Sequence, residues 1–226
     1  STSNYMDKHF MNFANQIKTF IKLKKIEKPL IVEIGSNDGI MLKRFKNMRH
    51  VGVEPSSNVA EVCRKKERCN VITEFFKKST VKKILKTYNK KVDVFYAANV
   101  MCHIENIKSV FFNISNSLSK KGIFVFEDPY MGDVIKKNSY DQIYDEHVYL
   151  FSLASISKLA ELYNLELFDA QIQNTHGGSM RYFLCKKSTY TKTSRLKKII
   201  LLEKKLRLDH LSTYKLFAKR VNQSKV

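Results

Sequence analysis

Residues 30–42 read L-I-V-E-I-G-S-N-D-G-I-M-L, and this stretch decides the class of fold. Its first five residues are mostly apolar, which is typical of a short strand buried in a parallel sheet. The run breaks at residues 35–39, which are small or polar and suit a tight turn with positive φ angles. A helical pattern starts at Ile40, and Asn37 or Asp38 can cap its first turn. A strand, a glycine turn and a helix in this order predict a nucleotide-binding α/β domain, whose ligand lies outside the carboxyl ends of the strands.

A second predicted strand, at residues 50–54, ends in an acid. Glu54 lies 19 residues after Gly35, close to the roughly 20 residues expected for an acid that binds a ribose hydroxyl. A carboxylate accepts hydrogen bonds from two neutral ribose hydroxyls, whereas a 2′-phosphate would repel it. Glu54 is therefore a candidate ribose ligand.

Strands and helices alternate along the next part of the chain. Further strands are predicted at 71–72, 91–98 and 122–127, with helices between them, so a parallel, doubly wound sheet is expected. Residues 165–172 and 179–185 then read as a pair of strands. The predicted fold is α/β and Rossmann-like, with a seven-stranded, mostly parallel sheet, an antiparallel closing strand, and helices at both ends.

Three segments are expected: an N-terminal helix over 1–27, the main domain over 28–189 and a basic helical arm over 190–226. Apolar residues recur at helical spacing between 196 and 221, which predicts one long basic helix. It would dock on this domain, on a further domain or on a second subunit, so a homodimer through this helix is one interpretation.

Composition narrows the classes of function. The net charge of +20 is compatible with binding to a nucleic acid. The charge is mostly lysine and is spread along the chain, without an RNA-recognition or helix-turn-helix signature, so it fits a lysine-rich proteome as well as an attraction to phosphorylated acceptors. The four cysteines have no C-x-x-C spacing, which predicts reduced thiols in a cytoplasmic protein. No apolar run approaches the roughly 20 residues of a membrane span.

Five ordered motifs carry a specific resemblance. They are E-I-G-S-N-D-G at 33–39, G-V-E-P-S at 52–56, N-V-M-C-H-I at 99–104, Y-D-Q-I-Y-D-E-H at 140–147 and H-G-G-S-M-R at 176–181. Together with the expected fold, they resemble the S-adenosylmethionine-dependent sugar-nucleotide C-methyltransferases. That family methylates keto-deoxysugars in antibiotic and surface-polysaccharide pathways. Its members usually begin with a cysteine-rich zinc-binding domain and end with a second α/β domain. The resemblance covers neither, so we expect either a fragment or a compact relative with a smaller acceptor.

The resemblance implies a role for each motif. It places S-adenosylmethionine, or its product S-adenosylhomocysteine, on the glycine turn and the next strand ends, at Gly35, Ser36, Asn37, Asp38, Gly39, Glu54, Pro55 and Asn99. It places catalysis on His147, Tyr144, Glu146 and His103. The acceptor would lie against His176, Arg181 and Tyr130.

The chemistry expected of these residue types needs no metal. A carbon beside a ketone becomes nucleophilic when a proton is removed, and a neutral histidine is a general base that suits neutral pH, which makes His147 the candidate base. A tyrosine hydroxyl or histidine N–H can stabilise the enolate oxygen. Glu146 could orient a histidine, with His103 or His176 as its partner. The sulfonium methyl is already activated, so positioning and proton removal suffice.

Several alternatives stay open at this stage. The same base could deprotonate a hydroxyl, an amine or a phosphoramidate oxygen, which would give O- or N-methylation of another small acceptor. An RNA methyltransferase or RNA-binding module would use the positive charge, and a non-catalytic scaffold would bind cofactor alone. His147 could equally be a structural histidine, and Arg181 could pair with an acid.

Overall fold

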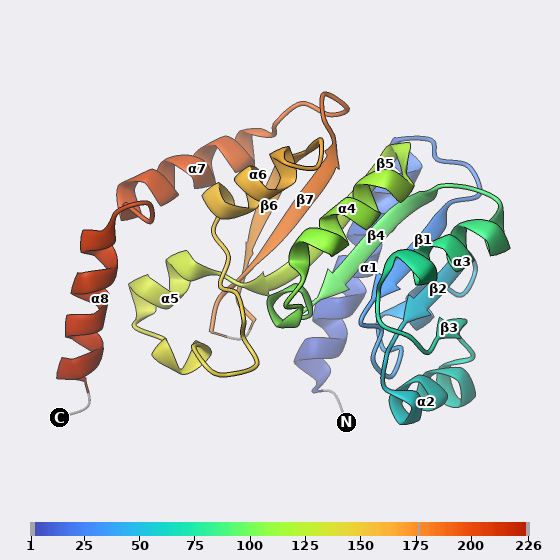
Figure 1. Cartoon of the computed structure of the whole chain (residues 1–226), viewed down its shortest axis with the longest axis horizontal. Coiled ribbons are helices and arrows are strands. Elements are labelled where there is room, and N and C mark those ends of the chain that lie inside the picture. The colour runs from blue at the N-terminus through green and yellow to red at the C-terminus, as the bar shows by residue number, and fades with distance from the viewer. Residues whose placement is uncertain (1–2, 176, 225–226) are drawn as a thin grey trace. The chain divides into compact units, whose positions relative to one another are not determined.

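The computed structural model describes residues 3–175 and 177–224, and Figure 1 labels their helices and strands. The chain divides into two compact units. One consists of Ser1–Ala97 and Phe112–Phe124, and the other of Ala98–Phe111 and Val125–Val226. His176, which was expected near the acceptor, lies outside the described residues.

The described strands form a seven-stranded sheet in the order β3-β2-β1-β4-β5-β7-β6. The strands are β1 (Leu30–Ile34), β2 (Arg49–Val53), β3 (Val71–Ile72), β4 (Val92–Ala98), β5 (Leu118–Pro129), β6 (Leu165–Gln173) and β7 (Ser179–Lys186). Strand β1 pairs in parallel with β2 and β4, and β2 pairs in parallel with β3. Strands β6 and β7 pair antiparallel. The predicted fold class is confirmed.

The first unit is built around β1, whose residues are all buried. Helix α1 (Asn4–Leu23) packs on the sheet through Phe13, whose ring lies 6.2 Å from that of Tyr96 in β4. Tyr96 donates its hydroxyl hydrogen to Glu33 over 2.7 Å. Burial raises the pKa of Glu33 well above its ordinary value, and this hydrogen bond compensates part of the cost of burying a carboxyl in the core.

The segments after the glycine turn differ from the prediction in detail. The expected helix at Ile40 is a single 3₁₀ turn, η1 (Leu42–Phe45), because β2 begins only four residues later. The expected cap does not form: η1 has no side-chain hydrogen bond at its N-cap, and the Oδ1 of Asp38 instead accepts the Ile40 N–H over 3.3 Å within the glycine turn. Helices α2 (Ser57–Glu67) and α3 (Lys78–Tyr88) complete this unit together with the end of α4 (Ile107–Ser117).

The second unit contains the C-terminal helices, and here the prediction of one long helix is wrong. Helix α7 (Ser194–Leu206) ends at Arg207, whose φ of 53° is left-handed, and α8 (Leu211–Gln223) follows. The reversal lets Phe217 of α8 pack against Val134 and Ile135 of α5 (Met131–Lys137). The arm therefore docks on its own unit.

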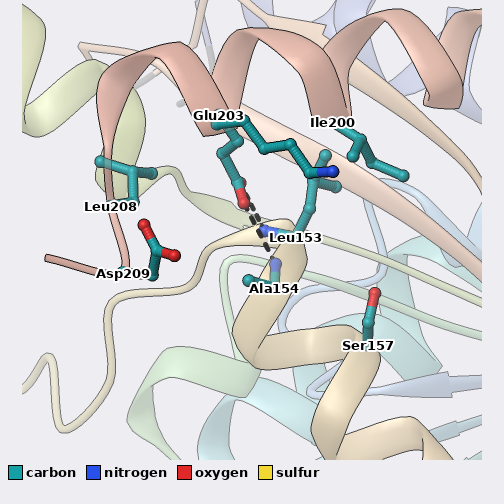
Figure 2. Close-up of a pocket in the computed structure, with 8 residues that line it drawn as sticks. Leu153, Ala154, Ser157, Ile200, Glu203, Leu208 and Asp209 are labelled. Atoms are coloured by element: carbon teal, nitrogen blue, oxygen red, sulfur yellow. Dashed lines mark hydrogen bonds between the residues drawn. The ribbon is translucent and has the colours of Figure 1, made fainter.

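Helix α7 is held to α6 (Leu153–Glu161) by a buried carboxylate, as Figure 2 shows. Glu203 accepts the backbone N–H groups of Leu153 over 2.5 Å and Ala154 over 3.1 Å. A negative charge at a helix N-terminus is favourable because it faces the positive end of the helix dipole. A cavity of about 220 Å³ lies beside this contact. No helix in the described ranges is long and apolar enough to cross a membrane.

Candidate active site

The glycine turn has the backbone conformation that its sequence predicts. Gly35, Asn37 and Gly39 have φ angles of 68°, 47° and 83°, a region that favours glycine and tolerates asparagine. The N–H groups of Gly35 and Ser36 both donate to the carbonyl oxygen of Val53 at the end of β2. The turn after β1 is thus fastened to the carboxyl end of the neighbouring strand.

Glu54 holds this turn and the start of α2 together. Its Oε2 accepts the Asn37 N–H over 3.0 Å, and its Oε1 accepts the Ser56 N–H over 2.9 Å. A carboxylate has about four acceptor positions, so each oxygen keeps one for a ribose hydroxyl. These residues therefore fit the nucleoside of S-adenosylmethionine.

Three other predicted cofactor ligands have a less direct relation to the cofactor. Ser36 is 1% exposed, and its Oγ lies against Gly52, where a Cβ would approach it to 2.4 Å, so this serine is buried beneath the turn. Pro55 is exposed beside Glu54. Asn99 follows β4 with a left-handed φ of 57°, and its N–H donates to the Glu127 carbonyl over 2.7 Å.

In the second unit, Tyr144 and His147 of the Y-D-Q-I-Y-D-E-H segment are hydrogen-bonded to each other. His147 Nδ1 lies 2.8 Å from the carbonyl oxygen of Gln142, and Nε2 lies 3.0 Å from the Tyr144 hydroxyl. A carbonyl only accepts, so Nδ1 carries the hydrogen. In the neutral ring Nε2 then accepts from Tyr144, whose pKa is raised by partial burial and by the charge of Glu146.

His103 approaches this pair from the end of β4. It lies in the 3₁₀ turn η2 (Met101–His103), and its ring centroid is 4.9 Å from that of His147. Its Nδ1 is 2.7 Å from the carbonyl oxygen of Glu146 and so donates to it. Among the described residues nothing hydrogen-bonds its Nε2, which leaves that lone pair open. The Glu146 residue thus orients His103 through its backbone, while its side chain is exposed.

The sequence of this chain matches two family models. The family model described as "Methyltransferase domain" matches residues 7–170. The chain belongs to the methyltransferase domain family. The predicted enzyme class and its cofactor, S-adenosylmethionine, are confirmed at this level. A second model, "C-methyltransferase C-terminal domain", matches residues 174–226.

Individual relatives agree with this assignment. C-methyltransferase NovU of Streptomyces niveus is 33% identical over 156 residues, which are 68% of this chain and 37% of NovU. The methyltransferase chain thus spans little more than a third of that relative's length. Among solved structures, an S-adenosylmethionine-dependent methyltransferase of Clostridium acetobutylicum has a TM-score of 0.62 at 13% identity, covering 79% of this chain and 92% of its own. Magnesium protoporphyrin IX methyltransferase of Synechocystis, solved with S-adenosylhomocysteine, has a TM-score of 0.59 at 12% identity. The match covers 83% of this chain and 90% of that methyltransferase. These two likenesses concern the fold.

Two expected acceptor ligands of this methyltransferase lie in its interior. Arg181 is 3% exposed, and its Nε and Nη2 donate to Glu127 over 2.9 and 2.7 Å. Tyr130 is also 3% exposed, and its hydroxyl interacts with Glu203. In this arrangement both side chains stabilise the second unit, and neither is presented to a small molecule.

Asp128 is a candidate functional residue that sequence reasoning missed. It is the last residue but one of β5, it is 1% exposed, and its Oδ1 accepts the Cys102 N–H over 3.3 Å. This bond fixes the turn that carries His103. Its Oδ2 has no hydrogen-bond partner among the described residues, and burial raises the pKa of Asp128 to about 7. The sequence did contain a signal for this residue. Asp128 is an acid at the C-terminal end of a strand, and the neighbouring strand in the sheet is followed by the N-V-M-C-H motif.

Proposed function

We propose that the chain is the methyl-transfer core of a C-methyltransferase that acts on a keto-deoxysugar linked to a nucleotide. The observation that carries this proposal is the arrangement of His103, Tyr144 and His147 within one unit. Two histidines, each held by a backbone carbonyl at Nδ1, lie beside a tyrosine hydroxyl. The similarity to NovU and to the C-methyltransferase C-terminal domain supports carbon as the methylated atom.

His103 is the residue that we assign to proton removal. A general base needs an open lone pair within reach of the substrate and a pKa near the working pH. The Nε2 of His103 meets the first condition, whereas that of His147 is covered by the Tyr144 hydroxyl at 3.0 Å. His103 therefore takes the proton from the carbon beside the ketone, and its Nδ1–H to Glu146 stabilises the ring as it gains charge.

Tyr144 and His147 serve the oxygen that becomes negative. While His147 is neutral, the Tyr144 hydrogen is directed to Nε2. When His147 is protonated at Nε2, the bond reverses and the tyrosine hydrogen is free to donate to the enolate oxygen. The pair thus supplies a hydrogen-bond donor whose direction follows the charge of His147.

The cofactor side of the proposal rests on Glu54 and the glycine turn. Bound S-adenosylmethionine supplies an electrophilic methyl group on a sulfonium. Glu54 binds the ribose hydroxyls, and Asn37 with Asp38 faces the methionyl end. A cytoplasmic location and a role in making a surface polysaccharide belong to the same proposal, because activated sugars are precursors of such polymers.

The test is a deuterium-exchange and product assay with a nucleoside-diphosphate 4-keto-6-deoxysugar. In D₂O without cofactor, the protein should exchange the hydrogen on the carbon beside the ketone, as NMR detects. With S-adenosylmethionine, the methyl group should appear on that carbon. His103→Asn should lose both reactions and retain S-adenosylhomocysteine affinity, while Asp141→Asn, a change at an exposed acid on the same segment, should behave like the wild type. A methyl group on oxygen, or full exchange by His103→Asn, would overturn the proposal.

A further inference from the structure

Two cysteines of the first unit are brought together where α2 ends. Arg68 is left-handed with a φ of 51°, and the Cys69 N–H donates back to the Cys63 carbonyl over 3.5 Å. The chain thus folds back on the end of α2, and Cys63 and Cys69 belong to one buried cluster with Leu42. Both are free cysteines.

Only one of the two sulfurs faces an opening. Cys69 is 5% exposed, and it lines a surface cavity of about 440 Å³ together with Arg64 and Tyr88. Cys63 is fully buried behind it. A small reagent that enters this cavity therefore reaches Cys69 first and Cys63 second.

The surroundings of Cys69 favour its reactive form. The neighbouring Cys63 thiol, with His50 and Lys46 nearby, lowers the pKa of Cys69 below its ordinary value. As a thiol, Cys69 donates to the Glu67 carbonyl over 3.4 Å. By contrast, burial raises the pKa of Cys185 to about 12. Since the thiolate is the nucleophile, Cys69 and Cys185 should differ strongly in reactivity.

The sulfur of Cys63 lies directly against the cofactor turn. A Cβ built on Gly39 would fall 2.2 Å from the Cys63 Sγ, so the sulfur packs on the α-carbon of that glycine. Gly39 has a φ of 83° and its N–H closes the turn onto the Ser36 carbonyl. A displacement of the Cys63 sulfur therefore removes a packing contact from the turn.

We propose that Cys69 and Cys63 form a modification site for hydrogen peroxide, and that the resulting disulfide loosens the glycine turn. The Cys69 sulfur attacks one oxygen of the O–O bond, which breaks; Cys69 becomes a sulfenic acid, and the other oxygen leaves as hydroxide and takes a proton to become water. The Cys63 sulfur then attacks the sulfenic sulfur, the S–O bond breaks, and a second water leaves with the Cys63 proton. Two thiols are oxidised and one peroxide is reduced to two waters. An S–S bond of about 2.05 Å draws the Cys63 sulfur toward Cys69, so its contact with Gly39 changes.

The experiment treats the chain with hydrogen peroxide and follows two readouts. Peptide mass mapping should find a Cys63–Cys69 disulfide that dithiothreitol reverses. Calorimetric titration should find that S-adenosylhomocysteine binds about tenfold more weakly to the oxidised chain, because small displacements in a preorganised site are costly. Formation of the disulfide does not depend on the proposed sugar acceptor. Only the binding measurement depends on the assignment of the chain as a methyltransferase.

Matched variants separate the outcomes. Cys69→Ala should form no disulfide and keep its affinity after peroxide, whereas Cys185→Ala should behave like the wild type in both readouts. Mapping of the wild-type chain itself keeps the test decisive if Cys69→Ala folds poorly. Oxidation at Cys102 or Cys185 before Cys69, or a disulfide that leaves the binding of S-adenosylhomocysteine unchanged, would overturn the proposal.

Discussion

Asp128→Asn tests the electrostatic cost of the buried carboxyl beside Cys102. Asp128 is 1% exposed, and burial is the main cause of a pKa raised from 3.8 to about 7, with the charge of Glu127 adding to it. Asparagine keeps an oxygen for the Cys102 N–H and removes the charge. The turn that carries His103 should therefore be preserved, while the ionisation is lost.

The size and sign of the effect follow from the pKa difference. A shift of about three units corresponds to about 4 kcal/mol at about 1.4 kcal/mol per unit, taken as an upper limit. The folded chain holds this proton more tightly than the unfolded chain does. The cost of ionising Asp128 is therefore absent below about pH 4, grows as the pH rises, and is complete above about pH 7. The stability of the variant relative to the wild type should rise by up to that amount between pH 4 and pH 8.

The assay is urea unfolding followed by circular dichroism at intervals from pH 4 to pH 8.5. Histidines and other acids titrate in both proteins, so the difference between the two curves isolates Asp128. Asp128→Ala should show the same pH dependence with lower stability throughout, because it also loses the acceptor for Cys102. Parallel curves for wild type and Asp128→Asn would refute the reasoning, since they would mean that Asp128 titrates alike in both states.

Further expectations concern the cofactor and the histidine cluster. Tyr144→Phe should lower turnover about 100-fold, as loss of a proton-donating group does, with the dissociation constant of S-adenosylhomocysteine unchanged in calorimetry. Glu54→Gln should weaken that binding about 10- to 100-fold, because hydrogen bonds to a charged group are worth about 1.5–3 kcal/mol; an unchanged constant would remove Glu54 from the site. One ligand atom each from Cys102, His103 and His147 lies within 4.8 Å of the others, so micromolar zinc should inhibit turnover and EDTA should restore it. Cys102→Ser should blunt that inhibition in the same rate assay, and equal inhibition of both proteins would argue against a shared ligand set.

Features that depend on neighbouring residues could be predicted from the sequence. The strand and glycine turn over residues 30–39, the acid at Glu54 and the β6–β7 pair all have the positions that their patterns indicate. Each is decided by local terms: φ angles open to glycine and the period of apolar residues. These terms act within a few residues and so can be read without the fold.

What only the tertiary structure decided is which side chain meets which. His103 and His147 stand 44 residues apart in the sequence, yet two backbone carbonyls of the same loop aim their rings together and leave one lone pair open. Arg181 was a candidate phosphate ligand, and the fold buries it against Glu127. The break at Arg207 returns α8 onto α5. Residue type determines what a group can do, but burial and long-range hydrogen bonds determine its partner, its protonation and its exposure.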